Sequence, residues 1–480
     1  MKKKFILPIL VLLAAQLFAQ TTNSPVTTTI KAFTVQEAVD YALQFNTQVK
    51  NAKLGVDQAK WRNVEIYTTG LPQISGNFDY TYYFKQPIAP ALSKIFSEGT
   101  LAKVFQTLAT GNPALGVPPN PAVAQVLMEG GNEAVSFVLP HNISTGLQVN
   151  QLFFDGRYVF GVKAAKELML TARLQSQMSD VEIKYTVIKA YYQAAAAKEA
   201  IALLQENLKV IEKLTADTRA TYQLGLIEEL DVNRLELAQA TLESQIALQK
   251  QMAEVAMANL KFQMGMPLNE ELILKDKLDE LKATVQVQDA VKQFEAKNRV
   301  EYDLLQSAIK LKGYDMRQKR VQYFPSLYGF LSYGWNSQSQ NGSELFKKDS
   351  WFDQGLVGLT LKVPIFDSGS KLAQVKQAKL EQQKSVNDFE NFKNAADLQY
   401  RAAQSSFAAA LTDESNTRKA QELSKKIFDR NTIKYKEGVA NSFELQQSEQ
   451  EFVTNQLKYI QSTLNLLNTK ADLDKALGTK

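Results

Sequence analysis

Few residue types in this chain could carry out chemistry. The 480 residues include no cysteine and a single histidine, His141. Disulfides, thiolate nucleophiles and multi-histidine metal centres are therefore excluded, and a metal or catalytic role for the lone histidine is disfavoured. Asp and Glu remain as acids and bases, but no paired carboxylates cluster on strand ends or loops, and no glycine-rich phosphate loop is present. We expect neither an enzyme nor a cofactor or metal ion.

The net charge gives no reason to expect a nucleic-acid partner. The chain has 55 Lys and Arg against 50 Asp and Glu, a formal charge of +5. Residues 1–19 combine Lys2, Lys3 and Lys4 with an apolar run over 5–15 and end at Ala19, which predicts a signal peptide. Its removal leaves 52 − 50 = +2. An N-terminal membrane anchor is the alternative, but the run is shorter than the ~20 residues a spanning helix needs.

Four long segments contain no Gly or Pro and are rich in helix formers. They are 162–224, 226–264, 370–437 and 439–477. Their apolar residues form narrow seams, such as Ile201, Leu204, Leu208 and Ile211. Seams of this width favour coiled-coil packing. We predict two helical hairpins, 156–265 and 370–477, with helices of ~65 residues that are ~100 Å long.

Four other segments alternate apolar and polar residues, as strands do. They are 72–84, 142–154, 326–336 and 354–366. In the first, Phe78 and Tyr80 lie on one face and Asn77 and Asp79 on the other. The pattern describes a membrane strand of ~10 residues as well as a half-buried soluble one.

The second half of the chain repeats the first at an offset of 212 to 213 residues: Tyr222 and Gly225, for example, align with Tyr435 and Gly438. After a linker over 20–33, the first repeat spans 34–266 and the second 291–480, with a segment over 267–290 between them. The first comprises a helix over 34–70, the first two strands, an insertion over 85–140 and the first hairpin. The second comprises a helix over 291–323, the other two strands, a loop over 337–353 and the second hairpin.

Four strands are too few to close a membrane barrel, for which ~8 is the observed minimum. If these strands span a membrane, several chains must therefore assemble, although this argument does not fix their number.

Several short motifs, in order and partly duplicated, resemble the TolC family of outer-membrane efflux proteins. They are Thr34-Val35-Gln36-Glu37-Ala38, Leu71-Pro72-Gln73, Phe154-Asp155-Gly156, Phe366-Asp367-Ser368-Gly369 and the two Tyr-x-x-Gly hairpin ends. The resemblance implies a mainly α fold with membrane β-strands. It implies a homotrimer whose protomers each give four strands to a 12-stranded β-barrel in the outer membrane. Long coiled-coil hairpins would form an α-helical barrel in the periplasm.

The resemblance also implies a function. Such proteins are passive exit ducts of tripartite efflux pumps, docking with a periplasmic adaptor and an inner-membrane pump of the RND, MFS or ABC type. The cargo would be small molecules such as drugs or metals, or polypeptides exported by type I secretion. The alternative is a periplasmic coiled-coil scaffold or adaptor without a pore.

The hairpin ends are the expected adaptor-docking sites. Gly225 and Gly438 interrupt otherwise continuous helical runs and permit turns with positive φ. The apolar neighbours Leu226, Ile227 and Val439 would supply a docking patch. Ordinary helix-to-helix turns are the alternative interpretation.

A periplasmic gate is implied by the resemblance alone. Asp231 and Tyr435 match a pair that links neighbouring hairpins, and Glu444 matches a carboxylate that faces the tunnel axis. Ala440 stands where a linking Arg is often found, and Gln447 where a second carboxylate occurs, so we expect a weaker closed state. Asp231 as a solvated or helix-capping carboxylate, and Glu444 as an exposed surface charge, remain alternatives.

The remaining candidate residues border the strands. Those expected to turn the chain from strand to helix are Phe154, Asp155, Gly156, Pro364, Phe366, Asp367 and Gly369. Those expected to anchor at the membrane interface are Tyr80, Tyr82, Phe84, Trp335 and Trp351. Core or loop packing is the alternative for the two tryptophans. The 85–140 insertion would face the cell exterior, either as amphipathic helices over the barrel mouth or as a mobile loop.

Overall fold

The computed structural model describes residues 31–86, 100–112, 114, 138–286 and 293–478. The expected signal peptide, most of the linker and much of the 85–140 insertion lie outside these ranges. The chain divides into two compact units. One comprises the segments up to residue 56, 172–305 and 388–480, and the other comprises 57–171 and 306–387.

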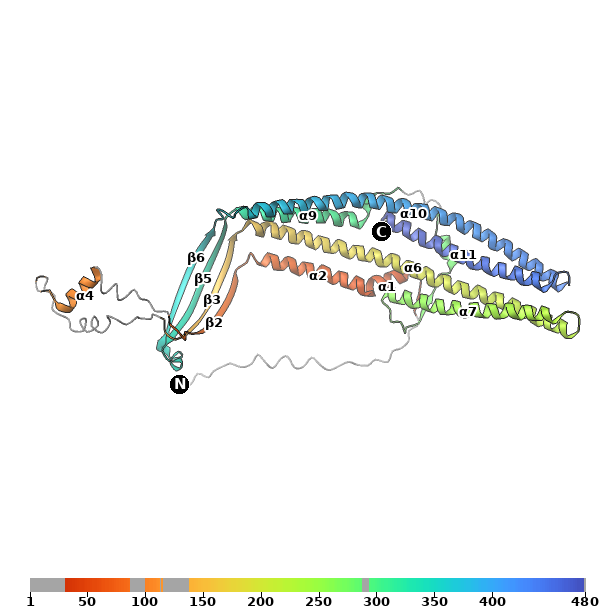
Figure 1. Ribbon diagram of the computed structural model, residues 1–480, viewed down its shortest axis with the longest axis horizontal. Coiled ribbons are helices and arrows are strands. Elements are labelled where there is room, and N and C mark those ends of the chain that lie inside the picture. Colours follow the sequence, from red (N-terminus) through yellow and green to blue (C-terminus); the bar gives the residue numbers. More distant parts are fainter. Residues whose placement is uncertain (1–30, 87–99, 113, 115–137, 287–292, 479–480) are drawn as a thin grey trace. The chain divides into compact units, whose positions relative to one another are not determined.

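A four-stranded sheet dominates the second of these units. β2 (Gln73–Tyr82), β3 (His141–Phe154), β5 (Ser326–Ser339) and β6 (Trp351–Lys362) pair antiparallel in that order (Figure 1). The helices α2 (Thr47–Thr68) and α9 (Val300–Arg320) lie mostly within this unit. Short 3-10 turns follow α9 and precede β6. They span Val321–Tyr323, Gly342–Glu344 and Lys348–Ser350.

One face of this sheet is apolar across all four strands. The register aligns Ile74, Val149, Leu331 and Val357 in one row, and Ile74 and Val357 are 72% and 80% exposed. The adjacent row on the opposite face contains Ser75, Gln148, Ser332 and Leu356. A strand alternates its side chains between faces, so the sequence pattern becomes a continuous exposed apolar surface on one side.

The two repeats leave the sheet by different means. In the first, the β3–β5 register shifts between Leu152 and Phe154, which is a bulge at Phe153. In the second, β6 ends at Lys362, and Pro364 follows without an N–H to donate to the ladder. The strand expected over 354–366 therefore runs over 351–362, while a bulge accompanies the strand-to-helix turn in the half that lacks the proline.

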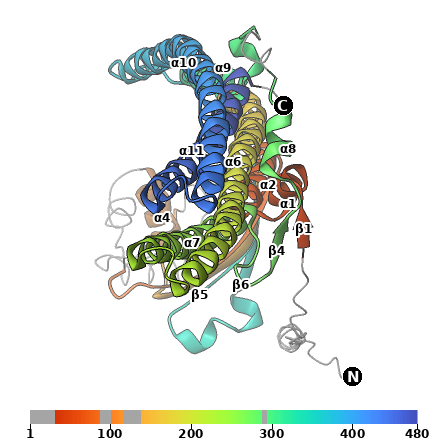
Figure 2. The same cartoon turned by 90° about the vertical axis from the view of Figure 1, so that its right-hand side faces the viewer.

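Two long helical hairpins follow the sheet strands. α6 (Gly156–Gln223) precedes α7 (Glu229–Met264), and α10 (Ser370–Lys436) precedes α11 (Ser442–Leu477) (Figure 1). Figure 2 views both hairpins from their turns. In the first unit, apolar residues of all four helices share one core that includes Leu204, Leu242, Phe428 and Leu445. The narrow seams seen in the sequence therefore bury against one another.

The helix expected over 34–70 is divided by Asn46. α1 (Val35–Phe45) begins with a capping box in which Thr34 and Glu37 each accept a hydrogen bond from the other's backbone N–H. Asn46 ends α1, and its side-chain oxygen accepts from the backbone N–H groups of Gln48 and Val49 at the start of α2. Its amide nitrogen donates to the Gln263 carbonyl, 2.7 Å away. This break is stabilised by contact with α7, which a local helical pattern does not reveal.

A second, small sheet was not expected from the sequence. β1 (Lys31–Phe33) pairs in parallel with β4 (Leu272–Leu274). Tyr191 of α6 ties the segment together: its hydroxyl donates to the Phe33 carbonyl at 2.9 Å and accepts from the Asp276 N–H at 3.2 Å. The short α8 (Leu278–Ala283) and the 3-10 turn Ala296–Asn298 complete the unit.

Lys282 of α8 fastens this segment to the second hairpin. Its ammonium lies 2.5 Å from the Glu414 carboxylate of α10 and donates to the Tyr459 hydroxyl of α11 at 3.0 Å. Within the insertion, α4 (Thr100–Thr110) is helical. In the portion of the chain that the structure describes, no helix is both long and apolar enough to cross a membrane.

Candidate functional site

The hairpin turns have the same backbone geometry in both repeats. Gly225 and Gly438 adopt φ of 75° and 74°, and each N–H reaches back to a tyrosine carbonyl, of Tyr222 and Tyr435 respectively. The next residue donates five positions back in each case, from Leu226 to Thr221 and from Val439 to Lys434. These are Schellman-type ends, which place glycine in the left-handed region.

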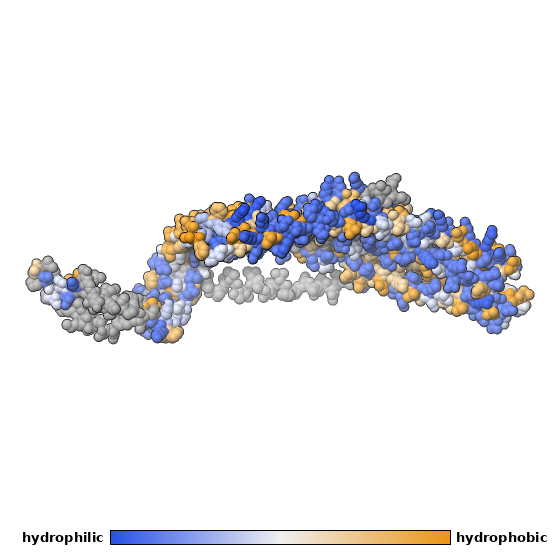
Figure 3. Space-filling model, turned by 45° about the horizontal axis from the view of Figure 1, so that its top comes forward, coloured by the Kyte–Doolittle hydropathy of each residue, from blue (hydrophilic) through white to orange (hydrophobic). Residues whose placement is uncertain are grey.

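Apolar side chains are exposed on these turns. Leu224, Leu226 and Val439 are 72–76% exposed, and Ile227 is half-buried. Hydrophobic atoms lie among polar ones at this end of the hairpins in the space-filling view (Figure 3). A single chain therefore presents apolar side chains on both turns, where few of its own residues cover them.

Beside the turns, Ser442 joins the two hairpins. The side chain of Ser442, the first residue of α11, is fully buried and donates a hydrogen bond to Oδ1 of Asp231 on α7. Arg234, one turn further along α7, donates to the same Ser442 oxygen at 3.1 Å, and its guanidinium lies 5.7 Å from the centre of the Phe443 ring. The two hairpins are thus linked through a small polar cluster.

Tyr435 makes a second link between the hairpins. Its hydroxyl lies 3.1 Å from the Thr218 hydroxyl of α6. Burial raises the pKa of Tyr435, and the nearby charge of Asp231 adds to the increase. Within one chain, Asp231 and Tyr435 therefore do not hydrogen-bond to each other, although they were expected to form one pair. Each instead bonds to a hydroxyl on the other hairpin.

The side chains of the other expected gate residues form no hydrogen bond or ion pair with any residue that the structure describes. Ala440 is half-buried in the turn, and Gln447 is exposed on α11. Glu444 is exposed in the first turn of α11, where its backbone N–H donates to the Asn441 side chain at 2.9 Å. Its carboxylate therefore lies near the positive end of the helix dipole, a favourable position for a surface charge.

In the sheet-containing unit, two aspartates begin the long helices. Asp155 accepts from the Arg157 backbone N–H at 2.8 Å, the Arg157 guanidinium at 2.6 Å and the Tyr328 hydroxyl at 3.0 Å. Asp367 accepts from the backbone N–H of Lys371 at 3.0 Å, and this bond lowers the pKa of the carboxyl. Gly369 follows with φ of 81°. Both aspartates thus act as N-terminal helix caps.

The neighbouring turn residues divide into packed and exposed ones. A Cβ on Gly156 would lie 2.9 Å from Val321, so this position requires glycine-like space. Phe154 and Phe366 are 52% and 86% exposed, and Pro364 is half-buried.

The expected interface aromatics lie near the strand ends distant from the long helices. Tyr80 is half-exposed, with its hydroxyl 2.9 Å from Nδ1 of His141, and Tyr82 lies against the same ring. Trp335 packs edge-on against Tyr333, while Phe84 is 91% exposed and Trp351 is half-buried. His141 is therefore an aromatic packing partner within this cluster.

Three of the linking residues escaped the sequence reasoning: Ser442, Arg234 and Thr218. Only Ser442 carries a signal, because it follows the helix-capping Asn441. Across the described ranges, no group of three or more His, Cys, Asp or Glu side chains could hold a metal ion.

Comparison with known proteins agrees with this architecture. Residues 301–479 match the family model described as outer membrane efflux protein. The chain is 23% identical over 238 residues to the proteases secretion protein PrtF of Dickeya chrysanthemi, a match that covers 49% of this chain and about half (50%) of that protein. It is 21% identical over 343 residues to the probable efflux pump outer membrane protein TtgC of Pseudomonas putida, covering 70% and 69%.

The fold is also that of a solved channel. The open-state structure of the MtrE outer membrane channel of Neisseria gonorrhoeae superposes with a TM-score of 0.67 at 20% identity, covering 92% of this chain and 88% of that one. The class defined by the duplicated strands and hairpins is therefore a mainly helical protein with β-strands and long helical hairpins, of the type found in channels.

The family match over residues 301–479, the relatives and the shared fold all support the TolC-type outer membrane efflux family that the motifs predicted. Location in the outer membrane, with the helical part in the periplasm, is likewise confirmed. Solved structures that share this fold include outer membrane channels.

Proposed function

We propose that this chain is the outer-membrane exit duct of a tripartite export system, acting as a passive homotrimeric channel. The observation that carries this proposal is the sheet, which has one exposed apolar face and has β2 and β6 as its outer strands. In lipid, unpaired backbone groups along such edges cost several kcal/mol each. Three copies would supply twelve strands, pair these edges and close a barrel whose apolar face meets the outer-membrane bilayer.

The two hairpin turns are proposed to dock with a periplasmic adaptor. Their shared geometry and the exposed Leu226 and Val439 support this assignment, because an adaptor would meet two similar apolar ends on each protomer. The inner-membrane partner would be a pump of the RND, MFS or ABC type.

The cargo would be small molecules such as drugs or metals, or polypeptides exported by type I secretion. The names of the relatives support both classes, since TtgC is an efflux pump protein and PrtF a secretion protein.

We also assign two tandem repeats, 34–266 and 291–480, joined by 267–290. The helix ends support this division: the ends at Gln223, Glu229 and Met264 in the first repeat correspond to those at Lys436, Ser442 and Leu477 in the second, each 213 residues later.

The direct test is to purify the full chain from outer membranes in detergent, to measure its mass by native mass spectrometry and to reconstitute it in a planar bilayer. We expect a trimer that conducts ions. A monomer that is released from membranes by a carbonate wash and gives no conductance would instead support the periplasmic scaffold.

A further inference from the structure

A carboxylate is buried without a partner between α7 and α11. Glu449 is only 6% exposed, yet its side chain forms no hydrogen bond or ion pair with any residue in the described ranges. Acidic side chains are almost never fully buried unless they are paired. Burial raises the pKa of Glu449 to about 7. The carboxylate oxygens, which no described protein group bonds, face the crevice described next.

Glu449 lines a cavity of about 280 Å³ whose walls come from α7 and α11. On the α7 side lies Gln245, whose buried Oε1 also has no hydrogen-bond partner among the described residues. Both unpaired groups are hydrogen-bond acceptors. The apolar side chains of Leu242 and Val453 line the same space.

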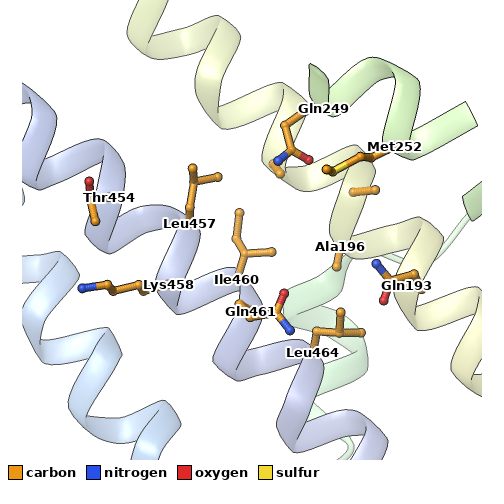
Figure 4. Close-up of a pocket in the computed structure, with 12 residues that line it drawn as sticks. Gln193, Ala196, Gln249, Met252, Thr454, Leu457, Lys458, Ile460, Gln461 and Leu464 are labelled. Carbon is orange, nitrogen blue, oxygen red and sulfur yellow. The ribbon is translucent and has the colours of Figure 1, made fainter. Parts of the chain in front are cut away.

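A second cavity of about 450 Å³ adjoins the first, because Thr454 lies on the wall of both. Here the lining is mostly apolar, with Ala196 of α6, Met252 of α7, and Leu457 and Ile460 of α11 around the space (Figure 4). Leu457 lies eight residues after Glu449, which is ~12 Å along the helix axis.

These features specify the chemistry of a ligand. Two unpaired acceptors need a group that donates hydrogen bonds, and the buried negative charge needs a positive one. A metal ion would leave most of the volume empty and would find a single carboxylate as its charged ligand. The adjoining apolar wall instead fits a hydrocarbon chain.

We propose that the crevice between α7 and α11 binds an amphiphilic organic ammonium ion, with its nitrogen between Glu449 and Gln245 and its chain towards Leu457 and Ile460. This binding site is independent of the proposed channel function, because it requires only the packed hairpins.

Isothermal titration of the full-length protein in detergent, with a protein-free detergent blank, tests the site. The probes are n-butylammonium, n-hexylammonium and neutral 1-hexanol. We expect both ammonium ions to bind and the longer one to bind more tightly, by up to ~15-fold for two buried methylenes. 1-Hexanol should bind at least about tenfold more weakly than n-hexylammonium.

Two matched variants locate the charge. Glu449→Gln should weaken binding of both ammonium ions at least about tenfold, whereas Glu451→Gln, which removes an exposed carboxylate from the same helix, should not.

A third variant tests the apolar wall. Met252→Gln should weaken binding of n-hexylammonium more than binding of n-butylammonium, because it makes this wall polar. No binding of either ion to the wild-type protein, equal binding by 1-hexanol, or equal losses in Glu449→Gln and Glu451→Gln would overturn the proposal.

Discussion

Ser442 donates its hydroxyl hydrogen to Asp231 across the two hairpins, so the first residue of α11 is bonded to the first turn of α7. Because Arg234 donates to the same oxygen, one small side chain satisfies a carboxylate and a guanidinium together. Links of this kind determine how firmly the hairpin ends are held.

Replacing this hydroxyl should loosen the hairpin ends. We expect Ser442→Ala to lower the free energy of unfolding by about 1–3 kcal/mol, because it leaves Asp231 and Arg234 without their shared partner. Chemical denaturation followed by circular dichroism measures this loss. Ser244→Ala, at an exposed position on α7, is the control and should change stability by less than about 0.5 kcal/mol. Equal effects in both variants would show that the link contributes nothing.

The proposed gate predicts an effect on conductance. Asp231→Asn weakens the bond to Ser442, and Tyr435→Phe removes the hydroxyl that meets Thr218. We expect each variant to spend more time open in a planar bilayer and to increase antibiotic leakage into cells. Unchanged single-channel records and unchanged leakage in both variants would argue that these residues do not hold the channel shut.

The stability of the protein should decrease as the pH rises towards 8. The pKa of Glu449 in the folded state is about 7, above the ordinary value of 4.5, so the folded state binds its proton more tightly than the unfolded state does. The associated stability is present below about pH 4.5 and is lost as the pH rises through 7, by about 3 kcal/mol in all. Denaturation curves across this range measure it. In Glu449→Gln this part of the pH dependence should disappear, whereas Glu451→Gln should retain it.

The two faces of the sheet should respond differently to a charge. Val357 lies in the exposed apolar row, whereas its neighbour Leu356 lies in the row with Ser75, Gln148 and Ser332. A lysine facing the bilayer midplane costs about 2–4 kcal/mol, but a lysine facing a water-filled lumen does not. Val357→Lys should therefore reduce the amount of protein assembled in the outer membrane, while Leu356→Lys should assemble normally. Immunoblots of membrane fractions compare them, and the reverse order would refute the assignment of the faces.

Alanine substitutions at two glycines with the same backbone conformation should distinguish the cost of backbone strain from the cost of a steric clash. Gly225 and Gly265 adopt φ of 75° and 72°, but a Cβ on Gly225 meets nothing within 4 Å, whereas one on Gly265 would lie 2.7 Å from the Asn46 Cα. Gly225→Ala should cost only the backbone strain of about 1–2 kcal/mol. Gly265→Ala should cost about 1–3 kcal/mol more, because α1 must move. Thermal unfolding measures the difference, which would vanish if the Asn46 contact were unimportant.

The long hairpins and the strands follow from local sequence. Absence of Gly and Pro marks the helices, a single glycine marks each turn, and strict alternation marks the strands. The β1–β4 pair cannot be predicted from local sequence, because strands of three residues are too short to show an alternation of apolar and polar residues. Similarly, the hydrogen bonds of Ser442 and Thr218 depend on how each helix is rotated about its own axis relative to its neighbours. The narrow apolar seams do not determine this rotation accurately enough to predict which polar side chains meet.

Glu449 did leave a trace in the sequence. It lies between Leu445 and Val453 at intervals of four, so a carboxylate interrupts an apolar helical stripe. Such an interruption predicts either a buried charge or a break in the packing, and only the three-dimensional structure distinguishes them.

The outer strands β2 and β6 also bear on biogenesis. If three copies close one barrel, the rate of folding depends on the concentration of protomers to a power greater than one, because no newly exported protomer can complete the barrel alone. Until partners arrive, the row from Ile74 to Val357 stays exposed to water, where it invites aggregation. Chaperones that shield nascent strands would then limit the yield of the duct, and its abundance would depend steeply on the rate of export.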